Sequence, residues 1–274
     1  MTAASGGAPW EIRGDAGAAP VLLVPPLGRG RASWAAQVPA LEQTCRCVLF
    51  DPRGIGAARS VAGSYTVETL AEDARAALDA AGVDRAHVLG WSLGAAAAMQ
   101  LALGHPARVA SLLLLTPWAR TDTHLATAFA TLRDLATCTP AVSAEIATLW
   151  LILSRSAVNA AGGQLAEGAR AAVADRGHPD AAVLAAYLDS AITFDVLDRL
   201  AAITVPTLVV GGAEDVLVPV AHARETAAAI PGARLHVLEG TGASHALPVE
   251  RADEVNALLR TFLDAQSATE WSIP

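Results

Sequence analysis

Residues 90–94 read Gly-Trp-Ser-Leu-Gly; they follow the apolar run 87–90 and open the Ala-rich stretch 92–103. A short continuous apolar run is typical of a strand buried on both faces, and an Ala-rich stretch favours a helix. A Gly-x-Ser-x-Gly pattern between strand and helix predicts a sharp turn that lifts the hydroxyl of Ser92 clear of the sheet. Ser92 is therefore a candidate nucleophile.

Similar apolar runs recur on both sides of this turn and alternate with helix-like stretches. Such alternation is typical of a doubly wound α/β domain. The sequence therefore predicts an α/β fold with a mostly parallel sheet of about seven to eight strands flanked by helices. The predicted strands are residues 10–13, 21–24, 47–50, 87–90, 111–115, 207–210 and 235–238, and the predicted helices are 66–81, 92–103, 220–230 and 252–263.

The alternation stops at residues 121–198, which hold Ala-rich helical pieces and no convincing strand. Glycine and proline residues interrupt these pieces, as expected between short helices. We therefore expect a helical cap at residues 121–198, inserted into a core made of residues 1–120 and 199–274.

Three further segments resemble the α/β-hydrolase fold family, and the resemblance extends over nearly the whole chain. They are residues 50–56 (Phe-Asp-Pro-Arg-Gly-Ile-Gly) followed by Ser60, residues 205–215 (Val-Pro-Thr-Leu-Val-Val-Gly-Gly-Ala-Glu-Asp) and residues 242–245 (Gly-Ala-Ser-His). The resemblance implies a serine hydrolase whose serine, acid and histidine follow in that chain order. Within the family, the cap and the loop are loosely similar to the enol-lactonase and aminoacrylate-hydrolase branch.

A serine hydroxyl is a weak nucleophile until a nearby base accepts its proton. Of the seven histidines, only His245 lies in a Gly-rich loop after the last predicted strand, at the sheet edge where the serine should emerge. The base in turn needs a carboxylate, and both Glu214 and Asp215 follow the strand at 207–210. The family's spacing favours Asp215. The loop after the strand at 111–115, where some members carry the acid, holds no carboxylate.

The loop after the second predicted strand reads Pro25-Pro26-Leu27-Gly28, where the family usually has a His-Gly pair. Proline has no backbone N–H, so the first available donor belongs to Leu27. The N–H of Leu93, next to the candidate nucleophile, is the second. We expect these two groups to form an oxyanion hole for a tetrahedral intermediate.

Several large side chains are candidates for contact with a substrate. Trp91 adjoins Ser92, and Trp118 and Trp150 are further candidates, although either is about as consistent with ordinary core packing. Arg29 and Arg31 follow the oxyanion loop. The sequence leaves open whether they bind a substrate carboxylate or are solvated at the surface.

The composition excludes several functions. All 19 basic residues are arginine, so no lysine is present to form a Schiff base or a phosphate-binding loop. A net charge of −8 gives no attraction to nucleic acid or to an anionic membrane. The three cysteines suggest no disulfide framework, and Cys45 and Cys47 alone cannot form a zinc site. We expect no cofactor and no metal, and a cytoplasmic location because no signal-peptide pattern is evident.

These residues predict a serine hydrolase that cleaves a small or medium ester, lactone or related acyl substrate through an acyl-enzyme, with a small molecule as its partner. Two alternatives stay open. One is a natural-product pathway cyclase or thioesterase-like enzyme that uses the same pocket, because one fold hosts many reactions. The other is a non-catalytic ligand-binding protein on the hydrolase fold. The sequence fixes neither the substrate nor the oligomeric state.

Overall fold

The computed structural model describes residues 9–175 and 177–270. Within these ranges, a seven-stranded sheet has the order β1-β3-β2-β4-β5-β6-β7. β1 is antiparallel to β3, and the other pairings are parallel. The predicted fold class is thus confirmed. The strands are β1 (Trp10–Arg13), β2 (Ala19–Val24), β3 (Cys45–Phe50), β4 (Ala86–Trp91), β5 (Val109–Leu115), β6 (Thr207–Gly212) and β7 (Arg234–Leu238).

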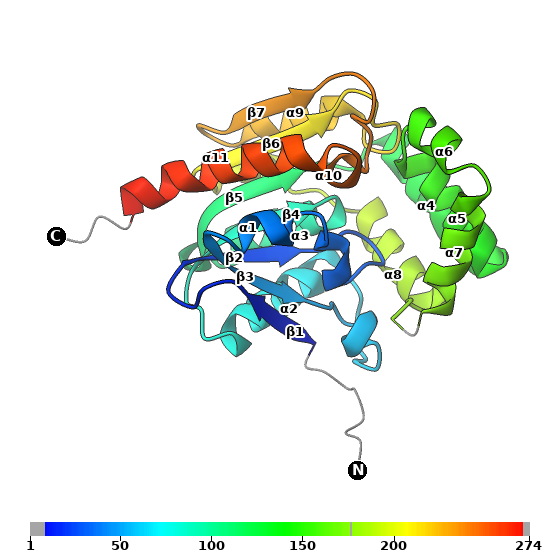
Figure 1. Ribbon diagram of the computed structural model, residues 1–274, viewed down its shortest axis with the longest axis horizontal. Helices are drawn as coiled ribbons and strands as arrows, with labels where there is room; N and C mark the ends of the chain where they lie inside the picture. Colours follow the sequence, from blue (N-terminus) through cyan, green and yellow to red (C-terminus); the bar gives the residue numbers. More distant parts are fainter. Residues whose placement is uncertain (1–8, 176, 271–274) are drawn as a thin grey trace, which may run out of the picture.

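Helices cover both faces of the sheet (Figure 1). Alternate side chains of a strand point to opposite faces, so each strand contributes to two cores. Leu22 of β2 joins the core under α2 (Val67–Ala80) and α3 (Leu93–Gly104), whereas Leu23 joins the core under α1 (Val38–Leu41) and α11 (Ala252–Glu270). The last helix, predicted to end at residue 263, continues to residue 270. The remaining core elements are α9 (Val220–Ala229), α10 (Leu247–Glu250) and the 3-10 turns Arg31–Trp34, Gly56–Ala58, Pro106–Arg108 and Leu197–Ala202.

The chain between β5 and β6 is helical, as the sequence predicts. Asp122 caps the first of these helices by accepting the N–H of Leu125 (2.9 Å), and Ser154 caps the third through the N–H of Ala157 (3.2 Å). α4 packs against α8, and α5 packs against α7. In Figure 1 these helices lie beyond the ends to which the parallel strands point. They are α4 (Thr123–Cys138), α5 (Ala141–Ile152), α6 (Arg155–Ala161), α7 (Gln164–Ala174) and α8 (Ala181–Ile192).

The two ends of this helical segment meet. The N–H of Thr121 donates to the carbonyl of Phe194 (2.9 Å), and Arg120 and Asp195 form an antiparallel bridge. The guanidinium of Arg120 also donates to the carboxylate of Asp195 (2.7 Å). The segment therefore leaves and re-enters the sheet at one place, since β5 and β6 are neighbours.

The division into a core (1–120 and 199–274) and a cap (121–198) stays a prediction about domain organisation. Residues 1–8 and 271–274 of that core, and residue 176 of that cap, lie outside the described residues. Across the described part of the chain, the structure holds no helix that is both long and apolar enough to cross a bilayer.

Two of the three cysteines are part of the core. Cys45 and Cys47 of β3 are buried on the same face of the sheet, in the core under α1 and α11. Burial disfavours the thiolate and raises the pKa of Cys47 to about 12. Both side chains therefore act as small apolar groups. Cys138, at the end of α4, is exposed.

Candidate active site

Ser92 occupies a strained turn between β4 and α3. Its φ is 56° and its ψ is −118°, a backbone conformation that residues with a side chain rarely adopt. Two glycines make the turn possible. A Cβ on Gly90 would lie 2.3 Å from the carbonyl oxygen of Gly94, and a Cβ on Gly94 would lie 2.1 Å from that of Val24. The backbone N–H of Ser92 donates to Leu115 of β5 (2.9 Å), which fixes the turn to the neighbouring strand.

The structure brings the predicted serine, histidine and acid together. His245 Nε2 lies 2.9 Å from Ser92 Oγ, and His245 Nδ1 lies 2.8 Å from Asp215 Oδ2. All three residues are less than 8% exposed. A carboxylate can only accept, so Asp215 selects the Nδ1–H tautomer and leaves Nε2 as an acceptor for the serine proton. The arrangement can therefore remove a proton from Ser92 and stabilise the imidazolium that forms.

Backbone hydrogen bonds position the acid and the loop that carries the histidine. Asp215 Oδ1 accepts the N–H groups of Leu217 (3.0 Å) and Val218 (2.8 Å), which leaves Oδ2 for the imidazole. The adjacent Glu214 is exposed, and its N–H donates to Ala243 of the histidine loop (2.8 Å). Of the two carboxylates left open by the sequence, only that of Asp215 contacts the imidazole.

The two predicted oxyanion donors belong to residues that line the same cavity as Ser92. Within the described residues, neither the N–H of Leu27 nor that of Leu93 donates to a protein acceptor. Leu93 begins α3, where a backbone N–H has no partner inside the helix. Leu27 lies in a turn closed by the N–H of Arg29, which donates to Pro26 O (3.1 Å). Both leucines line the cavity at Ser92, and their role as oxyanion donors stays a prediction.

A small apolar pocket of about 80 Å³ adjoins Ser92 and His245. Trp91 and Trp118 line it, and their contact with a substrate stays a prediction. Trp91 donates its indole N–H to the carbonyl of His245 (3.0 Å), and Trp118 is 1% exposed and contacts the ring of Phe129. The remaining lining is provided mainly by Pro26, Leu132, Thr148, Ile152, Leu188, Ala191 and Leu217.

Trp150 departs from the sequence-based expectation, since its side chain is 66% exposed. It does not line the pocket at Ser92, although its neighbours Thr148 and Ile152 do. Successive helical residues are about 100° apart, so a position midway between two inward-facing residues of α5 points away from the pocket. The structure therefore places the ring of Trp150 away from the pocket at Ser92, and gives no support to the predicted contact of Trp150 with substrate.

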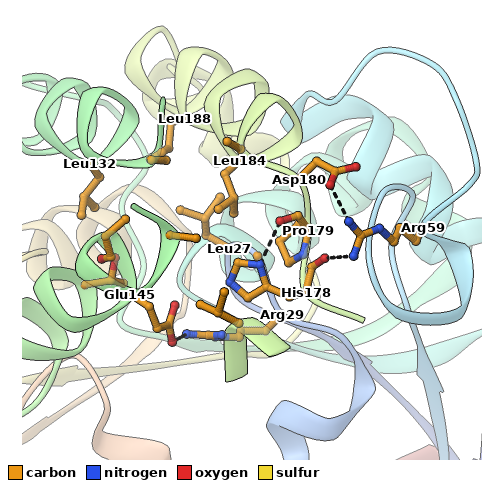
Figure 2. A pocket seen from close by; sticks show the side chains of 17 residues that line it. Leu27, Arg29, Arg59, Leu132, Glu145, His178, Pro179, Asp180, Leu184 and Leu188 are labelled. Atoms are coloured by element: carbon orange, nitrogen blue, oxygen red, sulfur yellow. Dashed lines mark hydrogen bonds and ion pairs between the residues drawn. The ribbon is translucent and has the colours of Figure 1, made fainter. Parts of the chain in front are cut away.

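A larger chamber of about 280 Å³ lies under the helical segment (Figure 2). It shares Leu27, Arg29, Leu132, Thr148 and Leu188 with the inner pocket. In it, Arg29 forms an ion pair with Glu145 of α5, a residue that the sequence did not single out. Arg31 lines neither cavity, and its backbone N–H donates to Asp51 Oδ1 (2.9 Å). The sequence did not distinguish the two arginines, but in the structure only Arg29 lines these two cavities.

Among the described residues, no cluster of three His, Cys, Asp or Glu side chains has the geometry to hold a metal ion. The chemistry assembled at this site is that of a buried serine, an imidazole, a carboxylate and two backbone donors. This set is the one required for nucleophilic attack on a carbonyl carbon.

The chain belongs to the α/β-hydrolase family and is a hydrolase: the family profile of the α/β hydrolase fold matches residues 19–245. It is similar to proteins named "Putative carbamate hydrolase RutD" from Variovorax paradoxus (strain S110), with 34% identity over 94% of this chain and 97% of the relative, and from Caulobacter sp. (strain K31), with 32% identity over 90% and 91%. Among solved structures it is similar to the enol-lactonase from Burkholderia xenovorans LB400, with a TM-score of 0.83 and 27% identity over 93% of this chain and 95% of that one.

Proposed function

We propose that this hydrolase cleaves small or medium esters, lactones or related acyl compounds through Ser92, His245 and Asp215. The observation that carries the proposal is the continuous hydrogen-bonded relay, with 2.9 Å from Ser92 Oγ to His245 and 2.8 Å from His245 to Asp215. The relay starts at a strained serine, and strain of this kind persists in proteins where a function depends on it.

In the first half-reaction, Ser92 Oγ attacks the acyl carbon while its proton passes to His245 Nε2. The carbonyl oxygen becomes an oxyanion, which accepts hydrogen bonds from the backbone N–H groups of Leu27 and Leu93. Asp215 stabilises the imidazolium. When the tetrahedral intermediate collapses, the bond to the leaving group breaks, and His245 returns the proton to the departing oxygen or nitrogen.

In the second half-reaction, water takes the place of the leaving group. His245 removes a proton from the water, whose oxygen attacks the acyl-enzyme and forms a second tetrahedral intermediate. Collapse of this intermediate breaks the bond to Ser92 Oγ, which regains its proton from His245. The products are the free acid and the regenerated serine.

The proposed substrate size rests on the cavities. The pocket at the serine has a volume of about 80 Å³ and is mostly apolar, which suits a short acyl or alkyl group. The adjoining chamber of about 280 Å³ has room for a further part of the substrate. Carbamates are related acyl compounds, and the relatives named for carbamate hydrolysis add them to the substrates to be tested. Residues 121–198 then act as the cap that closes both cavities.

A fluorophosphonate probe and the variant Ser92→Ala test this proposal. The probe should label Ser92 in the native protein, and the alanine variant should lose about 10⁶-fold in kcat across esters, thioesters, lactones and carbamates. Full activity of the variant would exclude the serine mechanism and favour a cyclase that uses only the pocket. Labelling of Ser92 without turnover of any of these substrates would favour a ligand-binding protein.

A further inference from the structure

The ion pair between Arg29 and Glu145 lies where the inner pocket meets the outer chamber. Arg29 lines both cavities. Glu145 lines the outer one (Figure 2). Arg29 is the last residue of the Leu27 turn, whereas Glu145 is the single charged residue of α5. Glu145 is 8% exposed, so its carboxylate is held in a poorly solvated place. A charge in such a place is costly unless it is paired, and Arg29 provides the pairing.

The ion pair uses only part of the hydrogen-bonding capacity of the two groups. Arg29 Nη2 donates to Glu145 Oε1. Within the described part of the chain, Glu145 Oε2 accepts no hydrogen bond, and Arg29 Nε and Nη1 donate none. None of these three atoms is fully buried without a hydrogen-bond partner, so each keeps some accessible surface. The wall of the chamber therefore presents an acceptor beside donors, on one ion pair.

The charges of the pair restrict which ligand gains from it. A lone carboxylate is attracted to Arg29 but repelled by Glu145, and an ammonium group meets the opposite combination. A neutral planar group with an N–H donor next to a carbonyl acceptor satisfies both residues without a net charge. Hydrogen bonds to charged groups are stronger than those between neutral groups.

A second ion pair that lines the chamber, between Arg59 and Asp180, is more exposed to solvent. Arg59 donates to the carboxylate of Asp180 and to the carbonyl of His178, and this group is separate from Arg29 and Glu145 in Figure 2. The side chains of Arg59 and Asp180 are 40% and 65% exposed, whereas those of Arg29 and Glu145 are 31% and 9% exposed. Water competes more strongly at the exposed pair, so the buried pair gives the stronger recognition.

We propose that the Arg29–Glu145 pair is a specificity site for a primary amide, or a similar neutral group with adjacent donor and acceptor, at the end of the substrate remote from the scissile bond. The inference rests on the proposed function, since it assigns a substrate feature to the same site. The acyl or leaving group extends from the serine past Leu27 into the chamber, and its amide oxygen accepts from Arg29 while its N–H donates to Glu145 Oε2.

Matched ester probes test this inference. One series consists of phenyl esters of straight-chain acids that end in a primary amide, and its partner series ends in the isosteric isopropyl group. A second pair of series carries the same two ends on the alcohol. We expect kcat/KM for the amide-ended probes to exceed that for the isopropyl-ended probes by about 10-fold or more in at least one series, the size expected of a hydrogen bond to a charged group.

The double variant Arg29→Met/Glu145→Leu removes both charges at once and so avoids a buried unpaired carboxylate. The amide-to-isopropyl ratio should then fall to about one or below. Arg120→Met is the matched control, because it removes an ion pair at the base of the same helical segment outside both cavities and should keep the ratio. An equal loss for both probes, with the ratio preserved, would show that the pair only holds the loop to α5.

Binding measurements separate this inference from the proposed hydrolysis. Calorimetry on Ser92→Ala should give a dissociation constant about 10-fold lower for the amide-ended probe. If the native protein turns over both probes without any preference, the specificity site is refuted, whereas the proposed hydrolase activity is supported. A preference for acid-ended probes would assign the recognition to Arg29 alone and overturn the paired site.

Discussion

A Cβ on Gly94 would lie 2.1 Å from the carbonyl oxygen of Val24, which ends β2. This close approach joins the start of α3 to the strand that leads into the Leu27 turn. Leu93 immediately precedes Gly94, so the separation of the two candidate oxyanion donors depends on the contact between these elements.

Gly94→Ala should therefore impair both stability and turnover. The added methyl meets backbone, which cannot rotate away, and overpacking of this kind costs about 1–3 kcal/mol. Chemical denaturation and kcat measured on one preparation check the prediction. Gly104→Ala is the matched control, because it lies in the same helix and a Cβ there has nothing within 4 Å. Equal behaviour of the two variants would contradict the close-contact argument.

Asp215→Asn should lower kcat by about 10⁴-fold with little change in folding. The amide keeps an oxygen for the N–H groups of Leu217 and Val218, but it no longer provides a carboxylate for His245. Glu214→Gln should leave turnover near that of the native protein, since Glu214 is exposed and its hydrogen bond to Ala243 is made through the backbone N–H. Steady-state kinetics of both variants identify the acid of the relay. A large loss of kcat in Glu214→Gln with native kcat in Asp215→Asn would reject Asp215.

Leu27→Pro should remove one oxyanion donor while keeping the turn. Gly28 has a φ of +66° at the third position of the turn from Pro26 to Arg29, which suits a type II turn, and proline is common at the position that Leu27 occupies. The expected loss is about 10²–10³-fold in kcat, with an unchanged unfolding temperature.

Leu27→Ala is the control for this prediction, because it trims the side chain and keeps the N–H; it should retain much of the activity. A stable Leu27→Pro protein with native turnover would place the donor elsewhere in the loop.

Trp118 and Trp150 should respond differently to truncation. Trp118→Ala removes a buried ring that packs on Phe129, and it should cost about 3–5 kcal/mol of stability and widen the pocket for longer acyl groups. Trp150→Ala should change stability by no more than about 0.5 kcal/mol and leave substrate preference unaltered, because its ring is exposed. Denaturation curves and a chain-length series of esters test both.

The features that could be predicted from the sequence depend on local chemistry. The turn at Ser92 is readable because its glycines are required by backbone contacts, and the strand pattern is readable because strands buried on both faces are apolar throughout. The orientation of α5 could not be predicted from the sequence. Its residues are apolar on nearly every side, so no periodicity showed that Thr148 faces inward and Trp150 outward. The partner of Arg29 was also hidden, because Glu145 is 116 residues away and only tertiary packing joins them.

The bridge between Arg120 and Asp195 has a consequence for how such an enzyme can diversify. Because the chain returns to the sheet beside the point where it left, the length and sequence of the intervening segment can vary without any change in strand order. Replacement of this segment with that of a relative, joined at residues 120 and 195, should transfer substrate range while the nucleophile turn stays intact. Natural selection can then change substrate preference through this helical segment while the residues around Ser92 are kept.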